Sequence, residues 1–105
     1  MPLTRDFKET IKARAETDPA FRAALLSESI GALLEGDIAA GKAVLRDYIN
    51  ATIGFEALAL DIGKDPKSLM RMLSVKGNPR ADNLFAVIHH LQKVTGVHLA
   101  VQAAE

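Results

Sequence analysis

The sequence of 105 residues contains no cysteine, which excludes disulfides, thiolate nucleophiles and cysteine-ligated zinc. It also lacks an apolar run of the roughly 18–20 residues that a membrane-spanning helix needs, and no signal-peptide pattern opens it. We therefore expect a cytoplasmic protein that makes no contact with a membrane. The net charge is zero, because 13 basic residues balance 13 acidic ones, so binding of a polyanion would require a local basic patch.

Patterns typical of enzymes are missing as well. There is no Gly-x-Ser-x-Gly motif and no glycine-rich loop that could cradle a phosphate. The three histidines are His89, His90 and His98. Neighbouring helical side chains point about 100° apart and do not readily chelate one ion, so we interpret these histidines as surface residues. The sequence thus predicts no catalytic residue, no metal site, no cofactor and no enzymatic activity.

The composition is that of one compact helical domain. Hydrophobic residues make up 49% of the chain and charged residues 25%, which are ordinary globular values. Apolar periodicity, helix caps and glycines predict an all-α domain over 1–105, with N-terminal helices in 1–54 and a second part in 55–101. The expected helices are 4–16, 19–35, 38–53, 55–62, 66–73 and 81–95.

The segment Val97–Val101 alternates apolar and other residues with a period of two, which predicts a short strand. A single strand cannot pair with itself. A symmetry-related copy of the chain is the simplest partner, and this favours a homodimer.

The two short predicted helices have the spacing of a helix-turn-helix motif. Gly63 stands where the chain must turn sharply, and Asp65 with Pro66 restarts a helix about three residues later. The second helix would present Lys67 and Arg71 outward, where a helix held in the major groove reads base edges. The same spacing also occurs in helix pairs that only pack together in all-α proteins, so DNA binding and plain packing both remain open.

Local charge favours the DNA-binding interpretation. Between residues 64 and 80, five basic residues stand against a single acid, Asp65, which gives this segment a net charge of +4 inside a neutral protein. Lysine and arginine can pair with phosphate or with guanine, and arginine can do so through two hydrogen bonds. The basic residues are Lys64, Lys67, Arg71, Lys76 and Arg80.

Several strings of residues carry a resemblance to a known family: Leu45–Ile49, Phe55–Ala59, Ser68–Ser74 and Gly77–Pro79. The most specific part is the Ser-Leu-x-x-x-Leu-Ser run followed by Gly-Asn-Pro. The C-terminal half of the chain resembles the lambda-repressor-like (Xre) helix-turn-helix domain, and more narrowly it is similar to the HigA-type addiction-module antitoxins. The N-terminal helices resemble this family only weakly.

The resemblance implies a transcriptional regulator that binds double-stranded DNA as a homodimer on a palindromic operator. Such antitoxins are often encoded beside a RelE/ParE-like toxin, bind that toxin and repress their own operon. By motif position, the base-facing sites of the family match Pro66, Lys67 and Arg71. Its phosphate-facing sites match Lys64, Ser68, Lys76, Asn78 and Arg80. The alternative is a protein-interaction module that binds a toxin or another partner without specific DNA binding.

Overall fold

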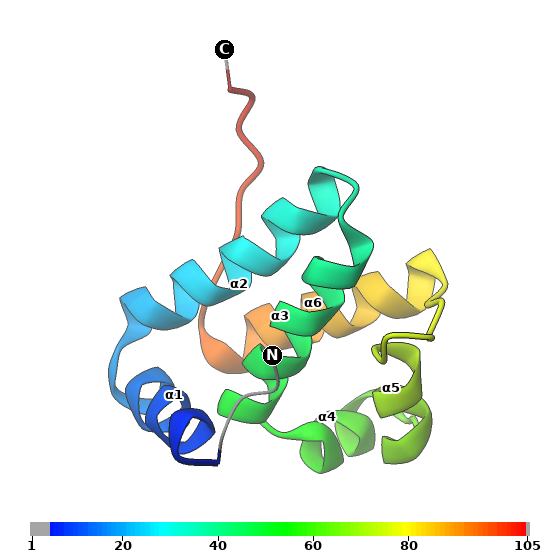
Figure 1. Cartoon of the computed structure of the whole chain (residues 1–105), viewed down its shortest axis with the longest axis horizontal. Coiled ribbons are helices and arrows are strands. Elements are labelled where there is room, and N and C mark those ends of the chain that lie inside the picture. Colours follow the sequence, from blue (N-terminus) through cyan, green and yellow to red (C-terminus); the bar gives the residue numbers. More distant parts are fainter. Residues whose placement is uncertain (1–4, 105) are drawn as a thin grey trace.

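The structure is a computed structural model that describes residues 5–104, and within this range the chain folds into six helices (Figure 1). They are α1 (Arg5–Thr17), α2 (Pro19–Leu34), α3 (Ile38–Ala51), α4 (Phe55–Ile62), α5 (Pro66–Met72) and α6 (Ala81–Thr95). The all-α prediction is confirmed. The predicted helix start at Thr4 lies outside the described residues. None of the six helices is long and apolar enough to cross a membrane.

Local signals explain where three of the helices begin. The side chains of Asp18, Asp37 and Asp65 each accept a hydrogen bond of 3.1 Å from the backbone N–H three residues further on. Each cap satisfies one of the unpaired donors at a helix start and contributes about 1 kcal/mol. Pro19 and Pro66 occupy the first position of α2 and α5, where a missing N–H has no consequence.

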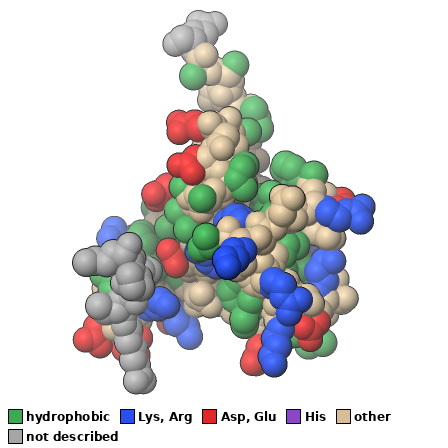
Figure 2. All heavy atoms as spheres, turned by 45° about the vertical axis from the view of Figure 1, so that its right-hand side comes forward, with side chains coloured by type: hydrophobic (Ala, Val, Ile, Leu, Met, Phe, Trp, Pro, Cys, Tyr) green, Lys and Arg blue, Asp and Glu red, His purple; other side chains and the backbone are tan. Residues whose placement is uncertain are grey.

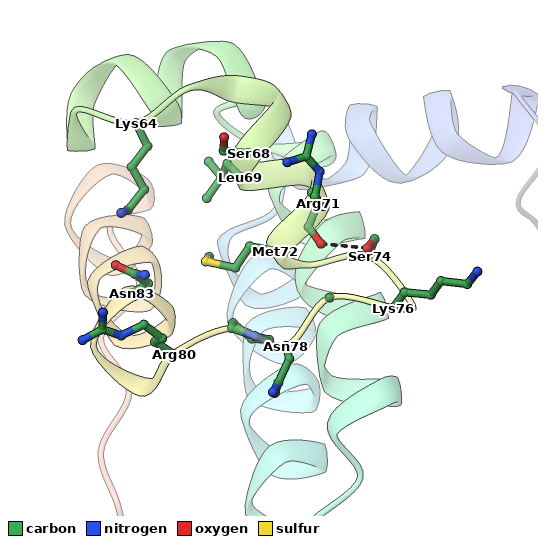
Figure 3. A pocket seen from close by; sticks show the side chains of 12 residues that line it. Lys64, Ser68, Leu69, Arg71, Met72, Ser74, Lys76, Asn78, Arg80 and Asn83 are labelled. Atoms are coloured by element: carbon green, nitrogen blue, oxygen red, sulfur yellow. Dashed lines mark hydrogen bonds between the residues drawn. The ribbon is translucent and has the colours of Figure 1, made fainter.

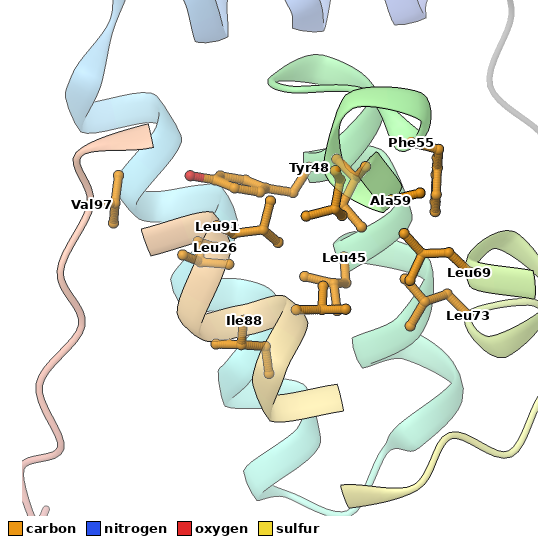
Figure 4. Close-up of a cluster of buried hydrophobic side chains, with 13 residues drawn as sticks. Leu26, Leu45, Tyr48, Phe55, Ala59, Leu69, Leu73, Ile88, Leu91 and Val97 are labelled. Atoms are coloured by element: carbon orange, nitrogen blue, oxygen red, sulfur yellow. The ribbon is translucent and has the colours of Figure 1, made fainter. Parts of the chain in front are cut away.

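The core lies around α3. Leu45, Tyr48 and Ile49 on this helix are completely buried, and complete burial of such side chains contributes about 1.5–3 kcal/mol each. They form one cluster with buried side chains of α2, α4, α5 and α6 (Figure 4). The labelled partners in that view are Leu26, Phe55, Ala59, Leu69, Leu73, Ile88, Leu91 and Val97. Because α5 belongs to this single core, its orientation is fixed by the whole bundle.

The predicted strand at Val97–Val101 is not formed among the described residues. Residues 97–104 instead run as an irregular tail that leaves the bundle beside α2 and projects beyond it (Figure 1). Val97 is buried, the Leu99 N–H donates to Oε1 of Gln92 over 2.8 Å, and Val101 is 94% exposed. The prediction is wrong for the single chain because a strand needs a hydrogen-bonding partner, and no described segment offers one.

Candidate nucleic-acid interface

The turn between α4 and α5 is sharp, as the glycine at position 63 predicts. Gly63 adopts the left-handed conformation with φ of 69°, which favours glycine. The Lys64 N–H donates to the Ala59 carbonyl over 2.9 Å and ends α4, and Asp65 caps α5 directly afterwards. The turn therefore sets the angle between the two helices.

One buried residue of α5 and its C-cap residue determine which side chains of this helix face outward. Leu69 and Leu73 lie in the core, with exposed fractions of 1% and 0%. Lys67 and Arg71 are both exposed and stand one helical turn apart, so they share one side of α5. The fold does not cover either of these two cations.

A groove of about 730 Å³ lies between α5, the loop over residues 73–80 and the start of α6 (Figure 3). We call it the basic groove. It is lined by Lys64, Ser68, Leu69, Arg71, Met72, Ser74, Lys76, Gly77, Asn78, Pro79, Arg80 and Asn83. Figure 3 draws Lys64, Arg80 and Asn83 along one side and Arg71 and Lys76 along the other.

The structure brings together six of the eight predicted site residues. Those that line the basic groove are Lys64, Ser68, Arg71, Lys76, Asn78 and Arg80. Pro66 and Lys67 do not line it: Pro66 is half-buried at the start of α5, and Lys67 is exposed outside the groove. A partner that contacted all eight residues would therefore have to cover the basic groove and the neighbouring side of α5 together.

The basic groove concentrates positive charge. Four of its lining side chains are cationic, and none of the described residues that line it is acidic. Arg80 forms an ion pair with Asp82 over 3.4 Å, but both side chains are largely exposed, so water and salt keep this pair weak. In the view of Figure 2, several lysine and arginine side chains stand at the centre and on the right-hand part of the molecule, with a few acidic side chains among them. The arrangement suits an extended polyanion better than a small neutral ligand.

The loop after α5 is held from behind by two cations of α3. Lys42 is only 4% exposed, and its ammonium group donates to the carbonyls of Ser74 and Gly77 over 2.8 and 2.6 Å. One turn further along α3, Arg46 donates through Nη1 to the Leu73 carbonyl. These contacts join residues that are 27 to 35 positions apart.

The loop also approaches α5 very closely at Gly77. A Cβ atom added at this position would lie 2.2 Å from the Arg71 carbonyl oxygen and 2.4 Å from that of Met72. Only glycine fits this distance without a shift of the backbone. Lys76 and Asn78 flank Gly77, so the close approach places them beside Arg71.

Sequence reasoning missed Lys42, Arg46 and Asn83. Lys42 lies four residues after Ile38 and three before Leu45, which puts it on the apolar side of α3, and a lysine there signals a buried cation with partners. Asn83 stands three residues after Arg80, which places both on one side of the first turn of α6. The signals for Lys42 and Asn83 were available in the sequence, whereas no sequence pattern indicated the contact of Arg46 with Leu73.

The histidines form no metal centre. Among residues 5–104 there is no group of three or more His, Asp or Glu side chains that could hold a metal ion. His90 contacts Asp61 over 2.9 Å and links α6 to α4, whereas His89 and His98 are exposed. The absence of a cofactor stays a prediction.

Comparison of the chain with protein-family models, with curated proteins and with solved structures found no significant match.

Proposed function

We propose that this protein is a sequence-specific DNA-binding regulator in which α4 and α5 act as a helix-turn-helix. The observation that carries the proposal is the basic groove: four cations, no acid, and a position beside an exposed face of α5, in a protein of zero net charge. Phosphate contacts from such a surface give affinity, and side chains that reach base edges give specificity. Lys67 and Arg71 are the proposed base-reading residues.

The decisive experiment measures binding to DNA from the region upstream of the protein's own coding sequence. Fluorescence anisotropy with this duplex and with a shuffled duplex would be recorded at several salt concentrations. We expect tighter binding to the upstream duplex and a fall in affinity with salt, with a slope of about −0.9 per phosphate contact in a double-logarithmic plot. The exposed α1 variant Lys12→Ala serves as the control for loss of one positive charge away from the groove. Binding that does not change with salt would contradict the proposal.

Homodimerisation is part of this proposal. Val101 is 94% exposed on a tail whose backbone has few partners, and pairing of two tails would bury it. A dimer would present two copies of α5 about 34 Å apart, so the operator would be a near-palindrome. We expect the wild-type protein to run as a dimer in light scattering after size exclusion, and Val101→Asp to shift it towards the monomer. A Val101→Asp variant that remains fully dimeric would rule out the tail as the interface.

The antitoxin role rests on the family resemblance of Ser68–Ser74 and Gly77–Pro79. We propose a RelE/ParE-like toxin as the protein partner and repression of the shared operon as the outcome. Co-expression with a toxin-like reading frame next to the gene, followed by co-purification, tests this part separately from DNA binding.

The second candidate function is a protein-interaction module. It is favoured by two apolar side chains at the α2–α3 corner, Leu34 at 75% and Ile38 at 47% exposure. If the upstream duplex and the shuffled duplex bind equally weakly while a partner protein binds stably, this candidate replaces the first.

A further inference from the structure

Lys42 is a charged residue in the interior of the molecule, and every donor of its ammonium group has an acceptor. The group donates to the carbonyls of Gly77, Ser74 and Val75 over 2.6, 2.8 and 3.4 Å. A lysine ammonium has three N–H donors and no acceptor, so three carbonyls match it. Burial of a charge is costly unless it is paired in this way. Position 42 therefore suits a long cationic side chain whose N–H groups reach the loop carbonyls.

Arg46 extends the same arrangement towards α5. It stands four residues after Lys42, on the same side of α3, and donates to the carbonyl of Leu73, the C-cap residue that follows α5. The last carbonyls of a helix have no partner within the helix and carry partial negative charge. Arg46 and Lys42 supply donors to the carbonyls that follow one another from the end of α5 into the loop.

The loop has few ties of its own. Within the loop, the Gly77 N–H donates to the Ser74 carbonyl over 3.0 Å. The Ser74 N–H and hydroxyl join the loop to α5, donating to the Arg71 carbonyl over 3.1 and 2.7 Å. Lys76 and Asn78 project from this segment and line the basic groove. Their position relative to Arg71 therefore depends on these few bonds together with the contacts that come from α3.

We propose that Lys42 and Arg46 are positioning residues that order residues 73–77 and thereby set the affinity of the basic groove for DNA without touching it. Neither residue lines the groove. The effect on DNA affinity rests on the proposed function. The ordering of residues 73–77 by Lys42 and Arg46 does not depend on that function. Without Lys42 the loop could still contact the phosphates, but it would have to become ordered on binding. The conformational entropy lost in this ordering lowers the affinity.

The test compares Lys42→Met with two matched variants that lose the same charge: Lys12→Met, exposed on α1, and Lys76→Met, exposed in the groove. For Lys42→Met we expect affinity for the upstream duplex to fall about tenfold or more, with an unchanged salt slope. For Lys76→Met we expect the magnitude of the salt slope to decrease by about 0.9, because one phosphate contact is lost. Lys12→Met should bind like the wild type.

Amide hydrogen exchange supplies the readout that does not involve DNA. In Lys42→Met we expect faster exchange at residues 73–78, and exchange in α2 and α3 like that of the wild type. Should Lys42→Met fail to fold, Arg46→Met is the second variant, because Arg46 is only half-buried and its change removes a single hydrogen bond to the loop. It should show the same effects at smaller size.

The outcomes separate the two proposals. If the wild-type protein binds no DNA, the proposed function fails, the consequence for affinity fails with it, and hydrogen exchange still decides whether Lys42 and Arg46 order the loop. If the wild type binds DNA but Lys42→Met and Arg46→Met bind equally well with unchanged exchange at residues 73–78, the positioning role is overturned. If Lys42→Met lowers the salt slope as Lys76→Met does, a phosphate contact is lost together with Lys42, which contradicts a loop that DNA binding can still order.

Discussion

Arg71 and Lys76 lie on the same wall of the basic groove, but we expect their replacement by alanine to have different effects. Arg71 projects from the body of α5, where its guanidinium can pair with a base edge, so Arg71→Ala should cost about 1–3 kcal/mol of specific binding and relax the preference at one base position. Lys76 sits on the loop, and Lys76→Ala should weaken all duplexes equally. Competition assays with single-base variants of the upstream duplex measure the difference. Equal losses on specific and shuffled DNA for both variants would contradict this assignment.

Gly77 is the residue whose replacement we expect to disturb the groove most without removing a charge. In Gly77→Ala the added methyl group would overlap the carbonyls of Arg71 and Met72, so the loop must move away from α5. We expect a loss of at least about 1 kcal/mol in the free energy of unfolding and weaker DNA binding. Denaturant unfolding measures the first and anisotropy the second.

Gly31 provides the matched control for this substitution. It lies inside α2, and no atom of the surrounding fold comes within 4 Å of a Cβ built there. Gly31→Ala should therefore raise the free energy of unfolding, by up to about 1 kcal/mol, through the higher helix propensity of alanine. If both variants lost stability equally, the close approach at Gly77 would not explain its effect.

At the scale of the element, the start of α5 combines a favourable cap with an unfavourable charge. Asp65 caps the helix through a hydrogen bond from the Ser68 N–H, yet it is the single acid between residues 64 and 80. Asparagine caps about as well as aspartate. We expect Asp65→Asn to leave the thermal unfolding temperature almost unchanged and to raise DNA affinity a few fold at low salt, because one repulsion of the phosphates is removed. An affinity that stays at the wild-type value at low salt would place Asp65 outside the DNA interface.

The helices could be predicted because their ends are determined by residues that are close together in the sequence. Asp18, Asp37 and Asp65 mark starts within three residues of the groups they cap, and Gly63 marks an end by its own conformation. The tail at residues 97–104 could not be predicted in the same way, because alternation describes a strand only when a second strand is available.

The groove could be predicted in part. Its cations were visible as a charge cluster between residues 64 and 80. The ties that shape the loop were not, because Lys42 lies 32 and 35 positions before its partners Ser74 and Gly77. Contacts over such separations depend on how α3 packs in the core, which periodicity within one helix does not specify.

At the scale of the whole molecule, the one tyrosine of the chain reports on the folded core. Tyr48 is fully buried, and its hydroxyl donates to Thr95 over 2.6 Å, since the Thr95 hydroxyl itself donates to the Leu91 carbonyl. Burial raises the pKa of Tyr48 above its ordinary value of 10.0. As the pH rises past 10.0, the unfolded chain loses this proton while the folded protein keeps it, so the free energy of unfolding falls.

Tyr48→Phe should remove this particular loss of stability. At neutral pH the variant should be less stable by about 0.5–1.5 kcal/mol, because the bond to Thr95 is gone. Above pH 10.0 its free energy of unfolding should decline less steeply than that of the wild type. Urea unfolding at neutral and alkaline pH measures both effects, and phenolate absorbance follows the single tyrosine directly. Parallel curves for the two proteins would show that Tyr48 does not couple stability to pH.

The reach of Lys42 from α3 to the loop limits how the molecule could be reused in protein engineering. A graft of residues 55–101 onto another scaffold would transfer α4, α5 and α6 but leave behind the two side chains that hold the carbonyls of residues 73–77. Such a chimera would contain the groove-lining residues of the loop, but the loop would lack its hydrogen bonds to α3 and would be less ordered. A transfer of the proposed DNA-binding surface to another scaffold would therefore have to include α3 as well.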